Sequence, residues 1–440
     1  MKINKKTILE LLIIFIITLV YNLVIQPLNQ DEIWNYGFAY NIATGLLPYK
    51  DFNMVITPLY PFLGSIFLII FGKSLLIYHI FNAITCTIIF YLIKKLIPRG
   101  YYIVYAFILL FSLPNYSLFC VLLLYLLMLM EEKKSNNYLI GIVLALTFLT
   151  KQHIGIMLCI PTLFTKNKEV ILKRIIGFLI PTTIFIIYLL ATKSLYQFID
   201  YAFLGISSFG EKNLLITIWI ILPLVSIIYL IYKYIKTKDI KALYLLFFQI
   251  ISYPIFDTYR VLLCFIPVVG YFLSKLKLVI KITRYAFIIF IIILFSTNIY
   301  QIFKNNNYPN DTTVYKYRNI DKNTEHQLNI IKNYMIESEK VYIIDENAYF
   351  IKLELEEPIT KYDLLNDGNM GKDGHVKIIK GIENNCKEKK CLFLMKKEEI
   401  NNNTLSQTNQ DIINYVNDNY KEIDKISVYT VYENEVIENE

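Results

Sequence analysis

The sequence has little of what a metal site, a removable signal peptide or a repeat-built transporter needs. Its four histidines are scattered along 440 residues, so they do not make a metal site. No small-x-small cleavage site follows the first apolar segment, which favours a retained transmembrane helix over a removed signal peptide. No internal repeat is visible, although detectable repeats are usual in transporters. The sequence therefore favours neither a metal site, nor a removed signal peptide, nor a transporter built from repeats.

Proline and glycine are also scarce, at 13 and 15 residues, whereas 55% of the chain is hydrophobic. Long apolar runs follow one another from residue 8 to residue 303, which is membrane composition. From residue 304 onward the chain is rich in Asn, Lys, Glu and Asp. We therefore expect a transmembrane domain at 1–303 and a second domain at 304–440.

The apolar runs predict an all-α, polytopic membrane bundle of about 11 transmembrane helices. Several runs are shorter than the ~20 residues that cross a bilayer. The short ones pair around Pro114, Lys151 and Asp257, which we interpret as sharp external turns. The predicted spans are 8–28, 75–97, 100–113, 117–130, 138–150, 154–165, 175–191, 214–235, 241–256, 259–274 and 285–303.

Charge predicts the orientation of these spans. A cytoplasmic N-terminus places 20 Lys and Arg residues inside and six outside, as the positive-inside rule requires. The first external loop and the C-terminal domain are then both extracytoplasmic. The net charge of +8 comes from cytoplasmic loops and is not a nucleic-acid signal. We expect a multi-pass protein of the cell (plasma or inner) membrane.

Two regions outside the spans have patterns of their own. Within the long first external loop, residues 58–72 are apolar but short, which predicts a juxtamembrane or half-inserted helix. In the tail, apolar runs at 341–345, 391–395 and 426–432 predict strands. Apolar residues at helical spacing after residues 324 and 411 predict two helices, so we expect a small α/β domain. Cys386 and Cys391 could close a disulfide there if the tail is outside the cytoplasm.

The most informative motif lies just after the first span. Asp31 and Glu32 form a carboxylate pair beside the bilayer, where charge is costly and usually has a task. The motif continues over Gly45, Pro48, Tyr49, Asp51, Phe52, Pro58, Leu59 and Tyr60. Together with LTKQHIG at 149–155, it resembles the GT-C glycosyltransferases. The nearest branch is glycosyltransferase family 39, the protein O-mannosyltransferase-like group, and related bacterial protein and lipid glycosyltransferases.

This resemblance implies an inverting sugar transfer outside the membrane. The donor would be a polyprenyl-phosphate sugar, and the acceptor an envelope glycan, a lipid or a protein. The resemblance gives Asp31 the role of general base, with Glu32 beside it. It implies no cofactor, although Asp31, Glu32 and phosphate could hold a divalent cation. In place of a lysine that some relatives carry before Pro58, this chain has Thr57.

Transfer chemistry also needs groups that hold the leaving phosphate. Lys151 and Arg260 are candidates, because both fall at predicted external turns and arginine can bind phosphate bidentately. Tyr49 and Tyr60 could offer hydroxyl donors or stacking faces, and Asp51 could join the site. Structural alternatives stay open: Asp51 could cap a helix, Lys151 could reach the headgroups, and Arg260 could pair with Asp257.

Two other functions stay open at this point. A transporter or flippase of a lipid-linked or sugar substrate would share the hydropathy pattern, but it leaves the long patterned loop unexplained. A sensor or assembly scaffold would have the tail as its working part.

Overall fold

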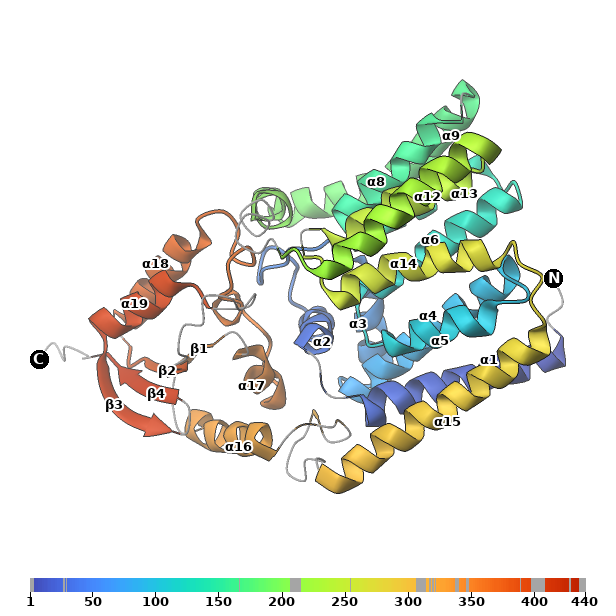
Figure 1. The fold of residues 1–440 in the computed structure, drawn as a ribbon. Coiled ribbons are helices and arrows are strands. Elements are labelled where there is room, and N and C mark those ends of the chain that lie inside the picture. Colours follow the sequence, from blue (N-terminus) through green and yellow to red (C-terminus); the bar gives the residue numbers. More distant parts are fainter. Residues whose placement is uncertain are drawn as a thin grey trace, which may run out of the picture. The chain divides into compact units, whose positions relative to one another are not determined.

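The computed structural model describes most of the chain and divides it into two compact parts (Figure 1). The part here called the bundle comprises the described residues within 1–27, 56–188 and 214–306, and the α/β part comprises those within 28–55, 189–213 and 307–440. The described residues are 4–26, 28, 30–165, 167–205, 215–253, 255–305, 314–315, 318, 320, 322–336, 340–345, 348–387, 389–396, 408–426 and 429–434.

The bundle is helical, and each of the eleven predicted spans overlaps one of its helices. Five of the described helices are long and apolar enough to cross a membrane, and shorter apolar helices accompany them. The elements are α1 (Lys5–Val20), η1 (Tyr21–Ile25), α3 (Leu59–Phe71), α4 (Leu75–Leu96), α5 (Tyr101–Leu110), α6 (Tyr116–Glu132), α7 (Asn137–Thr150), α8 (Gln152–Leu163), α9 (Lys168–Ala191), η3 (Ile218–Ile220), α12 (Ile221–Thr237), α13 (Ile240–Phe248), η4 (Gln249–Ser252), α14 (Thr258–Leu273) and α15 (Ile280–Asn305).

Short polar side chains fix where several of these helices begin. Oδ1 of Asn115 accepts a hydrogen bond from the N–H of Ser117 at 2.7 Å, and Oδ1 of Asp257 accepts one from the N–H of Arg260 at 2.7 Å. Such caps satisfy N–H groups that a helix leaves without a partner. The third predicted turn falls at Lys151, between α7 and α8. All three predicted turns therefore separate helices.

Burial differs sharply between the central and the outer helices of the bundle. Helix α4 packs against α1, α3, α5 and α6, and 61% of its apolar stretch is buried. Only 11% of the corresponding stretch of α15 is buried. Ile184, Ile228 and Ile282 are among the exposed large apolar side chains of α9, α12 and α15. An apolar outer surface of this kind suits contact with lipid tails.

The α/β part contains a four-stranded sheet of order β1-β2-β4-β3. Strands β1 and β2 run parallel, and β4 is antiparallel to both β2 and β3. The elements are α2 (Gln30–Ala43), α10 (Leu195–Ile199), η2 (Asp200–Leu204), α16 (Lys322–Ile336), β1 (Val341–Ile344), α17 (Ala348–Glu354), η5 (Lys361–Asp363), α18 (Gly374–Cys386), β2 (Leu392–Lys396), α19 (Gln410–Asn419), β3 (Lys421–Ile426) and β4 (Tyr429–Glu433).

The core of this sheet is apolar on the side that α18 and α19 cover. Ile378 and Ile382 of α18 and Ile412 and Val416 of α19 are buried around Phe393 of β2. The sulfurs of Cys386 and Cys391 form a disulfide between the end of α18 and the start of β2, with Cα atoms 5.7 Å apart. This bond fits the oxidised pair that the sequence allowed for.

Two segments from before residue 303 belong to the α/β part by their contacts. Helix α2 packs against α17, and Asp200 of η2 accepts hydrogen bonds from the N–H of Lys372 at 3.0 Å and from Nζ of Lys377 at 2.9 Å. The grouping therefore differs from the predicted division at residue 303 in these segments. The hydropathy of the sequence cannot reveal this grouping, because hydropathy does not report which loops pack on the tail.

Candidate functional site

Helix α2 carries both carboxylates of the predicted acidic pair in its first turn. Negative charge is favourable there, because the backbone N–H groups at a helix N-terminus carry partial positive charge. The two neighbours nevertheless differ in exposure: Asp31 is half-buried, whereas Glu32 is 0% exposed. Adjacent residues of a helix point in different directions, so one side can face solvent while the other faces the protein interior.

Glu32 is held in a buried ion pair. Its Oε2 accepts a hydrogen bond from Nη2 of Arg318 at 2.8 Å, and Arg318 is also fully buried. Removing either member of such a pair leaves the other as an uncompensated charge. Burial raises the pKa of Tyr36 and of Tyr315 well above the usual range, and nearby acidic and phenolic groups add to the effect. The phenols around this part of the fold are therefore neutral.

Asp31 lies on the same helix face as two polar atoms that have no hydrogen-bond partner within the described part of the chain. These atoms are Oδ1 of Asn35 and Nε1 of Trp34. Asn35 also donates from Nδ2 to the backbone oxygen of Asp31 at 2.6 Å. Residues three and four apart are neighbours on a helix. This part of α2 thus combines the half-buried carboxylate of Asp31 with a buried N–H donor and a buried oxygen acceptor.

Side chains near the C-terminal end of α2 form hydrogen bonds with the backbone of the segment after α17. Nδ2 of Asn41 donates to the oxygen of Ile359 at 2.6 Å, and the N–H of Ile359 donates back to Oδ1 of Asn41 at 2.8 Å. The hydroxyl of Tyr40 donates to the backbone oxygen of Glu356 at 2.5 Å. These bonds hold α2 against the segment after α17, and so they fix the orientation of the helix that carries Asp31.

The motif from Gly45 to Phe52 forms a closed turn. Gly45 has φ +95°, a left-handed conformation that glycine adopts without strain. The N–H of Tyr49 donates to the oxygen of Phe52 at 3.1 Å and closes the turn. The ring of Phe52 stacks on Phe38 of α2, with centroids 5.9 Å apart. Much of the motif therefore supports α2 structurally.

Asp51 and Tyr49 have structural contacts within this turn. Asp51 is exposed, and its Oδ2 accepts a hydrogen bond from the N–H of Leu47 at 2.8 Å. It caps its own turn and not a helix, since α3 begins only at Leu59. Tyr49 is 1% exposed, and its ring packs edge-on against Phe198 at 5.1 Å. Burial of the Tyr49 ring leaves little of it for stacking on a sugar.

Lys151 is a largely buried cation between α7 and α8 of the bundle. The residue is 7% exposed, and its Nζ donates to Oγ of Ser117 at 3.2 Å. The same Nζ lies 5.0 Å from the ring centroid of Tyr116. A hydroxyl and an aromatic face offset part of the hydration that the ammonium loses on burial. The side chain thus turns into the protein, where an ammonium can attract an anion.

Arg260 and Tyr60 have clear structural partners. Arg260 forms an ion pair with Asp257, the alternative that the sequence left open, while the same carboxylate caps α14. The Tyr60 ring is fully buried and lies 5.3 Å and 5.5 Å from the ring centroids of Phe81 and Phe119. Tyr60 is therefore part of an aromatic core, and no face of its ring is exposed to a ligand.

The predicted site residues are shared between the two parts of the chain. Asp31, Glu32, Tyr49 and Asp51 belong to the α/β part, and Tyr60, Lys151 and Arg260 belong to the bundle. Sequence reasoning missed Arg318, which follows Glu32 by 286 positions, and no local pattern could have paired them. Asn35 could have been found, because it stands one helical turn after Asp31.

The architecture of many apolar helices with a small α/β part is that of the GT-C membrane fold. Two solved structures of ArnT from Cupriavidus metallidurans, one bound to undecaprenyl phosphate and one in the apo state, share it. The TM-score is 0.57 for both, the sequence identity is 9% and 10%, and 98% of each chain is covered. The sequence itself matches no protein-family model and no curated protein.

Proposed function

We propose that this protein is an inverting glycosyltransferase that moves a sugar from a polyprenyl-phosphate donor to an extracytoplasmic acceptor. The observation that carries the proposal is the fold shared over 98% of the chain with a protein whose structure holds undecaprenyl phosphate. The acidic motif adds to it by its resemblance to family 39. The acceptor class is an envelope glycan, a lipid or a protein.

Asp31 is the general base of the proposed reaction. A hydroxyl that attacks an anomeric carbon needs a positioned group to take its proton. Asp31 is the half-exposed member of the acidic pair, and Trp34 and Asn35 offer a donor and an acceptor on the same helix face. These two side chains would orient the acceptor hydroxyl toward the carboxylate.

Glu32 is a positioning residue in this proposal. Its carboxylate is buried and already bonded to Arg318, so it is poorly placed to take a proton from a substrate. The ion pair instead ties the first turn of α2 to the segment that contains Arg318. Loss of that tie would shift the Asp31 carboxylate, and misplacement by about 1 Å can cost on the order of 100-fold in rate.

Lys151 holds the donor phosphate in the proposed reaction, and Arg260 assists it. The acceptor oxygen forms a bond to the anomeric carbon, while the bond from that carbon to the phosphate oxygen breaks. The proton of the acceptor passes to Asp31, and the polyprenyl phosphate leaves as an anion. A buried ammonium stabilises that developing charge better than an exposed one, because fewer water molecules screen it.

A transfer assay in membranes with radiolabelled polyprenyl-phosphate sugars tests this proposal. The comparison is between the wild type, Asp31→Asn and Asp51→Asn. We expect label to move to an acceptor with the wild type and with Asp51→Asn, but not with Asp31→Asn. Full activity of Asp31→Asn would refute its role as base. If no donor in a wide panel turns over, and a lipid-linked sugar crosses the bilayer unchanged, the protein is a flippase.

A further inference from the structure

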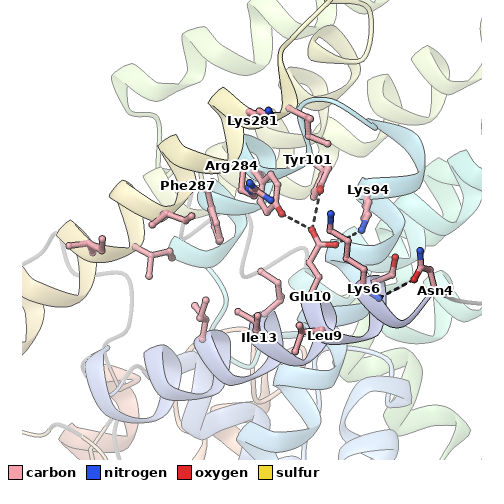
Figure 2. A pocket seen from close by; sticks show the side chains of 18 residues that line it. Asn4, Lys6, Leu9, Glu10, Ile13, Lys94, Tyr101, Lys281, Arg284 and Phe287 are labelled. Carbon is pink, nitrogen blue, oxygen red and sulfur yellow. Dashed lines mark hydrogen bonds and ion pairs between the residues drawn. The ribbon is translucent and has the colours of Figure 1, made fainter.

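A pocket of about 800 Å³ opens in the bundle at the end where α1 and α15 begin and α4 ends (Figure 2). Asp31, Lys151 and Arg260 do not line this pocket, so it is distinct from the site proposed above. It lies between α1 and α15, with Tyr101 and Tyr102 at the start of α5 beside it.

The polar end of the pocket is rich in positive charge. Glu10 forms an ion pair with Lys94 and accepts hydrogen bonds from the hydroxyls of Tyr101 at 3.0 Å and Tyr102 at 2.7 Å (Figure 2). These partners occupy the only carboxylate among the described lining residues. The lining cations are Lys6, Lys94, Lys281 and Arg284, which leaves a net charge of +3.

Three of these cations have no acidic partner among the described residues. Within the part of the chain that the structure describes, Lys6, Lys281 and Arg284 form no salt bridge. Lys281 and Arg284 are three residues apart near the start of α15, so they lie on one side of that helix. Their charges can converge on one anionic group, which would also relieve their mutual repulsion.

The rest of the pocket is apolar and open toward the lipid side of the bundle. Its walls include Ile13 from α1 and Ile288 and Ile292 from α15, which are 49%, 45% and 59% exposed. Farther along, α15 packs on η1, where the rings of Tyr21 and Phe295 lie 6.0 Å apart. The slot is therefore bounded by that contact at one end and by the cations at the other.

We infer that this pocket binds an anionic phospholipid, with its phosphate at Lys281 and Arg284 and an acyl chain in the slot between α1 and α15. A soluble anion would leave the isoleucine walls unused, whereas an uncharged or zwitterionic lipid would not compensate the net positive charge. Basic residues at the cytoplasmic surface attract anionic lipids in this way. The inference does not depend on the proposed sugar transfer.

Lipid binding to the purified full-length protein in detergent tests the inference by native mass spectrometry. The probes are phosphatidylglycerol and phosphatidylcholine with identical acyl chains, with inorganic phosphate as a competitor. We expect phosphatidylglycerol to bind at least 10-fold more tightly than phosphatidylcholine, without competition from phosphate. Equal affinity for the two lipids would overturn the inference, and displacement by phosphate would show a site for a free anion.

Variants locate the binding within the molecule. Lys281→Ala/Arg284→Ala should lower the affinity for phosphatidylglycerol roughly 10-fold, whereas the exposed neighbour Lys277→Ala, outside the pocket, should not. Glu10→Gln should raise the affinity, because it removes the one negative charge. Unchanged phosphatidylglycerol binding in the double variant would refute the assigned position. If that variant does not fold, the inference is still tested by the affinities of the wild type for the two lipids and by the affinity of Glu10→Gln for phosphatidylglycerol.

Discussion

Buried charges form ion pairs in both parts of the chain, such as Arg174 with Glu131 in the bundle, but the buried Lys151 of the bundle has contacts of another kind. In the α/β part, Glu32 is paired with Arg318, and Asp200 is bonded to Lys377 and to a backbone N–H. In the bundle, Lys151 lies against a hydroxyl and an aromatic ring. An ion pair stabilises the surrounding fold once it is formed, whereas we propose that the ammonium of Lys151 attracts the phosphate of the donor.

Breaking the Glu32–Arg318 pair is the strongest test of the first half of this comparison. We expect Glu32→Gln to lower the free energy of unfolding by about 3–5 kcal/mol, because it leaves the guanidinium of Arg318 buried without its partner. Denaturant unfolding of the detergent-solubilised protein measures this change. Glu357→Gln is the matched control: its pair with Lys352 is half-exposed and should contribute under about 1 kcal/mol.

Removing Lys151 tests the second half of the comparison. We expect Lys151→Met to lower the transfer rate about 10-fold to 100-fold, since a donor to the leaving phosphate is lost. Stability should be unchanged or higher, because burial of the ammonium costs free energy. Lys50→Met, at an exposed position, is the control for both measurements. A loss of stability as large as that of Glu32→Gln would make Lys151 a structural residue.

The cysteines also differ between the two parts, and their replacement should change the free energy of unfolding less than Glu32→Gln does. Cys386 and Cys391 are bonded in the α/β part, whereas the four free cysteines lie in the bundle. We expect replacement of both bonded cysteines by serine to lower the free energy of unfolding by about 2 kcal/mol, the value for a short closed loop. Reduction of the wild type should have the same effect. No change in either experiment would show that this disulfide does not constrain the unfolded chain.

The smallest expected effect concerns the turn that supports α2. Gly45→Ala should cost about 1 kcal/mol, because a left-handed conformation strains a residue that carries Cβ. Gly45→Asn should cost less, since asparagine tolerates that conformation. Thermal unfolding of the two variants gives the difference. An equal melting temperature for Gly45→Ala and the wild type would mean that the turn relaxes to another conformation.

Much of the bundle was predictable because long apolar runs and capped turns are local signals. The predicted spans fail mainly at their ends: α9 begins at Lys168 and α15 at Ile280, several residues before the apolar runs at 175 and 285. Lysine and arginine side chains in those first turns can reach the headgroups, so the helix extends beyond its apolar stretch.

The α/β part was less predictable because its order comes from contacts that are distant in sequence. Strand β3 was missed, since five of its six residues are exposed and four are charged, as suits the edge of a sheet. The sequence indicates Asp31 and Glu32 as one motif, but it does not indicate that Asp31 is half-buried and Glu32 fully buried. That difference depends on Arg318, which only the folded chain brings to Glu32.

We propose that the two adjacent carboxylates of α2, Asp31 and Glu32, have separate tasks. The most direct test measures the sugar-transfer rate and the melting temperature of Asp31→Asn and Glu32→Gln side by side. We predict that Asp31→Asn loses at least about 100-fold in rate and keeps its melting temperature. Glu32→Gln should show a clear fall in melting temperature. Wild-type transfer by Asp31→Asn, together with a stable but inactive Glu32→Gln, would contradict the account.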